Sequence, residues 1–100
     1  MGWATGHIAA LKEGRTVQFR PRGGSMAGRV ESGQLCTVEP LGTTPLAIGD
    51  IVLCSVRGTQ YLHLVKSLRH NQAQIGNNRG GINGWTPLKH VYGRCIRIDP

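Results

Sequence analysis

The chain has 100 residues, which suffices for one domain with a modest hydrophobic core. Twelve Lys and Arg against five Asp and Glu give a formal net charge of +7, which permits an acidic partner such as nucleic acid, but the basic residues are scattered and form no run. No apolar run approaches the ~20 residues of a membrane helix, and residues 1–10 lack the basic and apolar regions of a signal peptide. These features argue against a membrane protein, and we expect a cytoplasmic location.

The first 14 residues are expected to form a short helix. Thr5 can cap a helix over residues 6–13, and Gly14 can end it. The remaining residues, 15–100, are expected to form a β core, so that the chain is a single domain over residues 1–100.

Short runs of apolar and β-branched residues, separated by turn residues, predict strands through the rest of the chain. Residues 77–84 are rich in glycine and asparagine and predict a loop, and residues 85–90 predict one helical turn. The expected fold class is mostly β. The predicted strands cover residues 16–20, 34–39, 51–56, 60–68, 73–75 and 91–98.

The cysteines and three of the histidines give no sign of a metal site. The three cysteines form no Cys-x-x-Cys pair and lie inside apolar runs, so buried free thiols are expected rather than ligands or disulfides. Three histidines show no metal-ligand spacing with cysteine or carboxylate. We therefore expect neither a metal nor a cofactor. The residues concerned are Cys36, Cys54, Cys95, His7, His70 and His90.

Residues 21–28, with the sequence Pro-Arg-Gly-Gly-Ser-Met-Ala-Gly, are the stretch on which the predicted site depends. Glycines tolerate positive φ and permit close backbone approach, so this run predicts a tight loop that lifts Ser25 out of the sheet. A serine held in this way is a candidate nucleophile if a base reaches it. Without a base, a polar turn is the better explanation of the run.

The predicted strand Tyr61-Leu-His-Leu-Val-Lys66 offers two bases, His63 and Lys66. Successive side chains of a strand point to opposite faces, so in a regular strand only one of the two can face Ser25. A histidine pKa of ~6.5 leaves the imidazole mostly neutral at pH 7, whereas a lysine near ~10.4 must be strongly perturbed by burial. Neutral pH therefore favours His63 over Lys66, but the residues alone leave both open as the base.

Together these segments resemble the superfamily of signal peptidases and LexA-type self-cleaving repressors. The family serine stands in a Gly-x-Ser-Met-x-Pro-x-Ile pattern, and residues 23–30 read Gly-Gly-Ser-Met-Ala-Gly-Arg-Val. A second family block consists of a Gly-Asp strand, a hairpin turn and a returning strand that carries the base, and residues 49–65 match it. The resemblance covers residues 16–98 and implies a LexA/signal-peptidase-like complex β fold with serine peptidase activity.

The resemblance also implies a role for each residue of the pair. Counted from Gly49, His63 falls where the family base stands, which is lysine in bacterial signal peptidases and the repressors but histidine in the endoplasmic-reticulum and archaeal signal peptidases. Ser25 Oγ would attack a peptide carbonyl while His63 accepts its proton. The Ser25 N–H and a neighbouring N–H of the glycine loop would bind the resulting oxyanion.

The chain departs from the family pattern at three places. Gly28 stands where the family has proline, and Gln34 replaces a common acidic residue. Histidine-type members also use an acidic residue in a downstream Gly-Asp-Asn-like loop, whereas this chain has Gly76-Asn77-Asn78. An asparagine oxygen can orient an imidazole, although it stabilises the imidazolium less than a carboxylate does. Asn77 or Asn78 is the expected orienting residue.

Three functions remain open at this point. Signal peptidases carry a membrane anchor and the repressors a DNA-binding domain, and neither is evident here, so we expect a stand-alone catalytic core that acts on a protein or peptide substrate. The first alternative is an inactive module of the same fold that binds a protein segment by strand addition. The second is nucleic-acid binding, which rests on the net charge and two tryptophans without a recognised motif. The sequence does not specify the substrate, the cleavage site or the oligomeric state.

Overall fold

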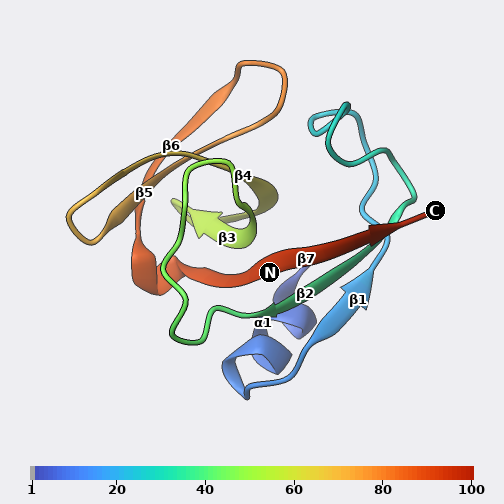
Figure 1. The fold of residues 1–100 in the computed structure, drawn as a ribbon, viewed down its shortest axis with the longest axis horizontal. Helices are drawn as coiled ribbons and strands as arrows, with labels where there is room; N and C mark the ends of the chain where they lie inside the picture. The colour runs from blue at the N-terminus through green and yellow to red at the C-terminus, as the bar shows by residue number, and fades with distance from the viewer. Residues whose placement is uncertain (1) are drawn as a thin grey trace.

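The computed structural model describes residues 2–100, which form one antiparallel sheet of seven strands with one α-helix packed against it (Figure 1). The strands lie in the order β1-β2-β7-β3-β4-β5-β6, so β7 joins the N-terminal strands to the others. The mostly-β class with one short N-terminal helix is thereby confirmed. No helix in this part of the chain is long and apolar enough to cross a membrane. The elements are α1 (Thr5–Lys12), β1 (Val17–Phe19), β2 (Leu35–Pro40), β3 (Ile51–Val56), β4 (Thr59–Arg69), β5 (Gln72–Gly76), β6 (Ile82–Pro87), η1 (Leu88–His90) and β7 (Val91–Asp99).

Helix α1 is held by packing rather than by a side-chain cap. Its N-cap residue is Ala4, and no side chain bonds to the free N–H groups of the first turn, so the predicted cap at Thr5 is wrong. Thr5 Oγ1 donates instead to Gly2 O at 3.1 Å. Ile8 and Leu11 are buried against the sheet and fix the helix there.

Strand β6 is the main difference from the sequence prediction, which places a loop and a helical turn in this region. The strand pairs with β5 along its length, with Thr86 opposite Ala73, and only the short 3₁₀ helix η1 follows it. Gly84 has a φ of 134°. Because Gly84 and Pro87 are unfavourable in strands, the segment is not recognised as a strand from its sequence. The backbone N–H and C=O groups of β6 pair with those of β5. This pairing stabilises the strand, although the local sequence does not predict one.

The sheet curls strongly, so that β6 returns to β3. Thr86 Oγ1 on β6 donates to Ser55 O on β3 at 2.8 Å, although β4 and β5 lie between these strands in the sheet order. Register shifts in the β4–β5 and β5–β6 pairs mark the irregularities that accompany this curvature. Side chains of β4 and β6 can therefore meet across β5.

Two buried clusters fill the fold on the two sides of the curled sheet. One contains side chains of α1, the residues 21–34 loop and strands β2, β3 and β4, and the other contains side chains of β3, β4, β5 and β7. The loop of residues 21–34, which carries Ser25 and is drawn in cyan in Figure 1, is thus anchored in the first cluster. That cluster comprises Ala4, Ile8, Leu11, Met26, Val30, Cys36, Val38, Ile51, Leu53, Leu62 and Leu64.

The β3–β4 hairpin fixes the position of His63. Its two turn residues, Arg57 and Gly58, have φ angles of 51° and 83°, as the twist of a tight two-residue hairpin requires. This turn sets a register in which Val52 lies opposite His63. Because a slip of one residue would turn His63 to the other face, the turn determines which face carries the imidazole.

The Gly49-Asp50 pair secures the other end of this hairpin. Gly49 N donates to Val65 O at 2.8 Å, and Val65 N donates to Asp50 O at 2.9 Å. The Asp50 carboxylate accepts from Arg94 Nε at 3.0 Å and from Ala47 N at 2.9 Å. The acidic residue of the second sequence block therefore has a structural role, since it ties β7 and the preceding loop to the start of β3.

We expect Gly93→Ala to lower the free energy of unfolding by about 1–3 kcal/mol, because an added methyl group would overpack a closed site. A Cβ on Gly93 would lie 2.6 Å from Glu39 O and 2.8 Å from Val38 Cγ1. Gly6→Ala is the matched control, since a Cβ there meets nothing within 4 Å and the helix should gain roughly 0.5–1 kcal/mol. Urea unfolding monitored by circular dichroism measures both values, and equal stability of the two variants would contradict the packing described.

Candidate active site

The loop that carries Ser25 is fixed on both sides of the serine. Val30 N donates to Met26 O at 2.8 Å, which makes a single helical turn directly after Ser25. Met26 and Val30 lie on one face of that turn and are only 5% and 3% exposed. Gly33 N donates to Pro21 O at 2.8 Å and closes the base of the loop. Ser25 itself remains exposed, so the loop presents its hydroxyl from a rigid support.

Asn78 fastens the serine loop to the β5–β6 connection. Its backbone N–H donates to Ser25 O at 2.9 Å, and its Nδ2 donates to Ala27 O at 2.8 Å. Gly28 makes this approach possible, since a Cβ there would lie 3.0 Å from Asn78 Nδ2. The φ of Gly28 is 94°, which proline cannot adopt. The loop therefore has a local conformation that excludes the proline of the family pattern at this position.

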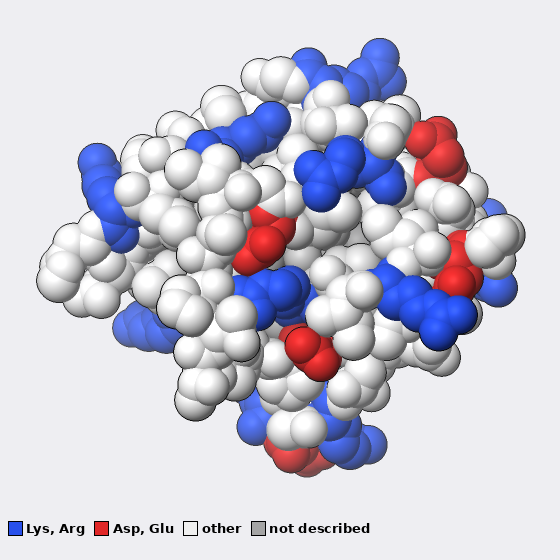
Figure 2. Space-filling view, viewed as in Figure 1, with Lys and Arg blue, Asp and Glu red and all other residues white. Residues whose placement is uncertain are grey.

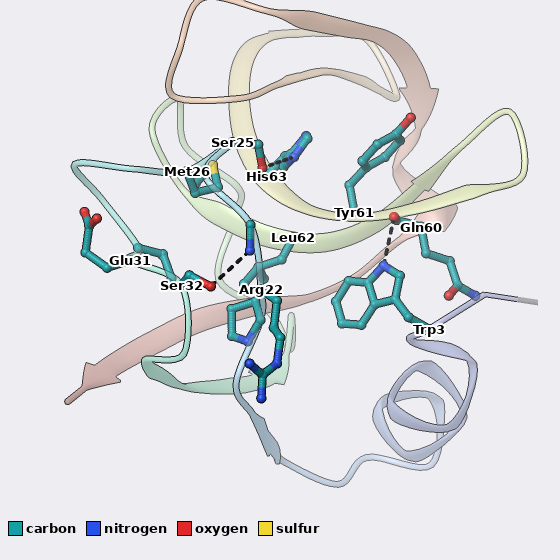
Figure 3. A pocket seen from close by; sticks show the side chains of 13 residues that line it. Trp3, Arg22, Ser25, Met26, Glu31, Ser32, Gln60, Tyr61, Leu62 and His63 are labelled. Atoms are coloured by element: carbon teal, nitrogen blue, oxygen red, sulfur yellow. Dashed lines mark hydrogen bonds between the residues drawn. The ribbon is translucent and has the colours of Figure 1, made fainter.

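His63 lies beside Ser25 and bonds through both ring nitrogens. Ser25 Oγ is 3.2 Å from His63 Nε2 (Figure 3), and His63 Nδ1 is 2.7 Å from Asn83 Oδ1. An amide oxygen can only accept, so Nδ1 carries the proton and Nε2 is left as the acceptor that faces the hydroxyl. This tautomer is the one that a general base for Ser25 requires.

Burial and stacking hold the imidazole in place. His63 is 7% exposed, and the ring of Tyr61 stacks on it with centroids 4.7 Å apart and an interplanar angle of 26°. Burial lowers the pKa of His63 below its usual 6.5, and the hydrogen bond to Asn83 opposes this shift only in part. The imidazole is therefore neutral, and able to accept a proton, at pH 7.

The asparagine that contacts His63 is Asn83, and not Asn77 or Asn78, which the sequence predicts in that place. Asn77 Oδ1 accepts from Arg79 N and Gly81 N, both at 2.8 Å, and so closes its own loop. Asn78 supports the serine loop, as described above. Asn83 reaches His63 because β6 is a strand and the sheet curls. The signal that could have located it is the alternation of residues 82–87, once these are assigned to a strand.

Lys66, the alternative base, does not lie with Ser25. It sits at the register shift between Val65 and Ser67, where β4 is irregular. Its stem packs over Gly76, since a Cβ on that glycine would lie 3.0 Å from both Lys66 Cγ and Lys66 Cε. Among the described residues Ser25 Oγ has one side-chain partner, which is His63.

Backbone donors are available next to the serine. Ser25 directly precedes the helical turn that begins at Met26, and the first N–H groups of such a turn have no acceptor within it. Neither the N–H of Ser25 nor that of Met26 bonds to another group of residues 2–100. Such donors can bind negative charge that develops on an oxygen close to the serine.

Ser25 and His63 lie in a cleft of about 160 Å³. Buried apolar side chains form part of its lining, and the exposed side chains of a tryptophan and two charged residues complete it (Figure 3). The lining residues are Trp3, Pro21, Arg22, Gly23, Ser25, Met26, Val30, Glu31, Ser32, Gln60, Tyr61, Leu62 and His63.

The cysteines are poor candidates for a nucleophile. All three are free, and burial raises the pKa of Cys54 to about 12. The pKa of Cys36 is also about 12, because of burial and then of the neighbouring Cys95. Thiols in this state are poor nucleophiles at neutral pH. Within residues 2–100, no group of three or more His, Cys, Asp or Glu side chains is placed to hold a metal ion.

Positive charge is dispersed over the face shown in Figure 2, where lysines and arginines alternate with uncharged and acidic residues. Among the described residues, Arg94 pairs with Asp50, and Arg97 pairs with Asp99 at 2.9 Å. On this face the charge forms no continuous basic stripe of the kind that follows a nucleic-acid backbone.

Comparison with protein-family models finds no match for this chain, and comparisons with curated proteins and with solved structures find none either.

We expect the pKa of His63 to lie below 6.5 in the folded protein and to be higher in Asn83→Asp than in the unaltered protein, because a carboxylate at the same place stabilises the imidazolium. An NMR titration of the imidazole protons measures the pKa of His63 in both proteins. The resonance that is missing from the spectrum of His63→Gln identifies His63. Asn77→Asp is the matched control, since Asn77 does not contact the ring, and it should leave the titration of His63 nearly unchanged. A larger shift in Asn77→Asp than in Asn83→Asp would contradict the geometry.

Proposed function

We propose that the protein is a serine peptidase related to the signal peptidases and LexA-type repressors, with Ser25 as nucleophile and His63 as general base. The observation that carries the proposal is the line of two hydrogen bonds from Ser25 Oγ through the imidazole to Asn83 Oδ1, at 3.2 and 2.7 Å. A serine, a base within reach and a third group that orients the base are the arrangement that nucleophilic catalysis requires. The serine and base segments that resemble the family supply two of these three groups.

In the proposed reaction the Ser25 hydroxyl adds to the carbonyl carbon of a peptide bond and transfers its proton to His63 Nε2. The carbonyl oxygen becomes an oxyanion, and the N–H groups of Ser25 and Met26 are the donors proposed to bind it. His63 then protonates the leaving amine, and an acyl ester on Ser25 remains. Water attacks this ester with the same proton transfers, which releases the acid and restores the serine.

Asn83 is the positioning residue in this proposal. Its oxygen holds the Nδ1–H tautomer while His63 is neutral and remains an acceptor when His63 becomes an imidazolium. A neutral amide stabilises that cation less than a carboxylate does, so we infer a weaker base than in a site with an aspartate. Tyr61, stacked on the ring, restricts its rotation.

Peptide binding without cleavage is a second function that the neutral partner of His63 favours. Such a module would use the same cleft and would not depend on the Ser25 hydroxyl. Retention of peptide binding together with absence of cleavage in the unaltered protein would identify it.

Ser25→Ala is expected to lower kcat/KM for peptide cleavage by at least about 10³-fold, and His63→Ala by about 10²–10⁴-fold. Lys66→Met is the control and should retain most of the activity, because Lys66 packs over Gly76 and not against the serine. Mass spectrometry of a diverse peptide library, incubated with each purified variant, measures these rates. Equal cleavage by the unaltered protein and Ser25→Ala would refute the proposed nucleophile.

The dependence of cleavage on pH gives an independent check of the base. Activity requires neutral His63, so kcat/KM should rise with pH and reach half of its plateau below pH 6.5, in the direction of the shift that burial causes. In Asn83→Asp the half-maximum should move to higher pH. A rise only at alkaline pH would instead assign the proton transfer to a lysine.

A further inference from the structure

The segment before α1 is bonded to the strand that carries His63. Trp3 Nε1 donates to Gln60 O at 3.2 Å, and Ala4 N donates to Gln60 Oε1 at 2.7 Å. Gln60 Nε2 donates in turn to Thr5 Oγ1 at 3.1 Å. Gln60, at the start of β4 and three residues before His63, thus bonds to three consecutive residues near the N-terminus, 3–5.

This attachment places the Trp3 indole at the cleft and leaves it open on one side. Phe19 of β1 packs edge-on against the ring, with centroids 5.4 Å apart. The side chain nevertheless stays 53% exposed and is one of the residues that line the cleft (Figure 3). A large aromatic surface, held rigidly by a hydrogen bond and a ring contact, is therefore free to contact whatever enters beside Ser25.

Three buried apolar side chains contribute to the lining of the cleft, beside polar residues such as Ser32 and Gln60. Met26, Val30 and Leu62 are 5%, 3% and 5% exposed. The two charged residues of the lining, Arg22 and Glu31, are both exposed. A charged group inserted among the buried side chains would lose water without gaining a partner, whereas an apolar group would gain contact.

The volume of the cleft limits the size of its occupant. About 160 Å³ is much more than the roughly 10–15 Å³ that one water molecule needs, and less than the roughly 300–1,000 Å³ of pockets that enclose drug-sized ligands. One or two side chains of a peptide fit this space. Since Ser25 and His63 line the same cleft, the side chain that enters it belongs to a residue next to the cleaved bond.

We propose that Trp3 is a specificity-determining residue, and that together with Met26, Val30 and Leu62 it selects a substrate with a large apolar side chain, such as Leu, Met or Phe, next to the scissile bond. The inference rests on the proposed peptidase function, but the binding it describes does not require cleavage. The N-terminal segment is then part of the substrate site, and removal of the indole widens the cleft and exposes its floor to water.

The expected selectivity is measurable. One methylene in an apolar pocket changes kcat/KM by about 10–200-fold, so peptides with Leu or Phe at this position should exceed the matching Ala, Lys and Glu peptides by at least about 10-fold. Trp3→Ala should reduce this ratio several-fold, because it lowers kcat/KM for the Leu and Phe peptides more than for the Ala peptide. Trp3→Phe, which keeps the ring contact with Phe19, guards against loss of folding and should give an intermediate ratio.

The test has a binding arm and a cleavage arm, each on the full chain. For binding, the probes are capped peptides that differ only in Ala, Leu, Phe, Lys or Glu at one position, and the signal is tryptophan fluorescence of the Ser25→Ala protein. Ser25→Ala/Trp85→Phe keeps Trp3 as its one indole and should show a saturable change with the Leu and Phe peptides. The matched control, Ser25→Ala/Trp3→Phe, retains Trp85, which lies against Arg69 and does not line the cleft, and should show none.

The outcomes separate the two proposals. Serine-dependent cleavage without preference for large apolar side chains, or with a preference that Trp3→Ala leaves intact, overturns the role of Trp3 and retains the peptidase. A Trp3 fluorescence change with apolar peptides, without any cleavage, retains the role of Trp3 in binding and overturns the peptidase. No fluorescence change up to millimolar peptide overturns the role of Trp3, whatever the cleavage arm shows.

Discussion

The arrangement of the site depends on the requirement that a buried imidazole be hydrogen-bonded at both nitrogens. His63 is 7% exposed, and no buried side-chain nitrogen or oxygen within residues 2–100 lacks a partner. An unbonded ring nitrogen at this place would be strongly unfavourable. The two partners come from different parts of the chain: Ser25 from the loop between β1 and β2, and Asn83 from β6. Satisfying one buried side chain therefore joins the serine loop, the β3–β4 hairpin and the end of the sheet into a single site.

Curvature of the sheet makes this junction possible, and glycines permit the curvature. Asn83 lies on β6, which β5 separates from β4. In a flat sheet its side chain would therefore be too far from His63 to form a hydrogen bond. The register shift between Ile75 and Gly76 bends the β5–β6 hairpin, and a Cβ on Gly76 would lie 2.4 Å from Gly81 O. The position accepts no side chain because the backbone of the neighbouring loop lies against it. The hydrogen bond from the Thr86 hydroxyl to Ser55 O joins β6 to β3 and stabilises the curled sheet.

The sequence predicts those parts of the site that depend on local patterns, and it does not predict the parts that depend on tertiary structure. The apolar run of β3 and the turn after it are local, so the hairpin and the face of His63 follow from them. The glycines around Ser25 likewise predict an exposed loop. Asn83 was missed because its contact needs both the β5–β6 pairing and the curl, and Gly84 hides the strand. Asn78 was assigned to the wrong partner for the same reason, since its proximity to the serine loop is not encoded in the spacing between them.

An asparagine beside His63 is consistent with the electrostatics of this site. A carboxylate at the position of Asn83 would be a second ionisable group next to a ring that burial already keeps neutral, and its desolvation would have to be offset by an imidazolium. With an amide there, no formal charge lies at the dyad in the resting state, and the pKa of His63 stays low. The imidazole is then available as an acceptor at pH 7, but the cation that the proposed reaction forms on it is less stabilised. In the proposed peptidase, this arrangement combines a base that is neutral at pH 7 with a smaller driving force for each proton transfer, which suits slow cleavage of a tightly positioned peptide better than rapid turnover.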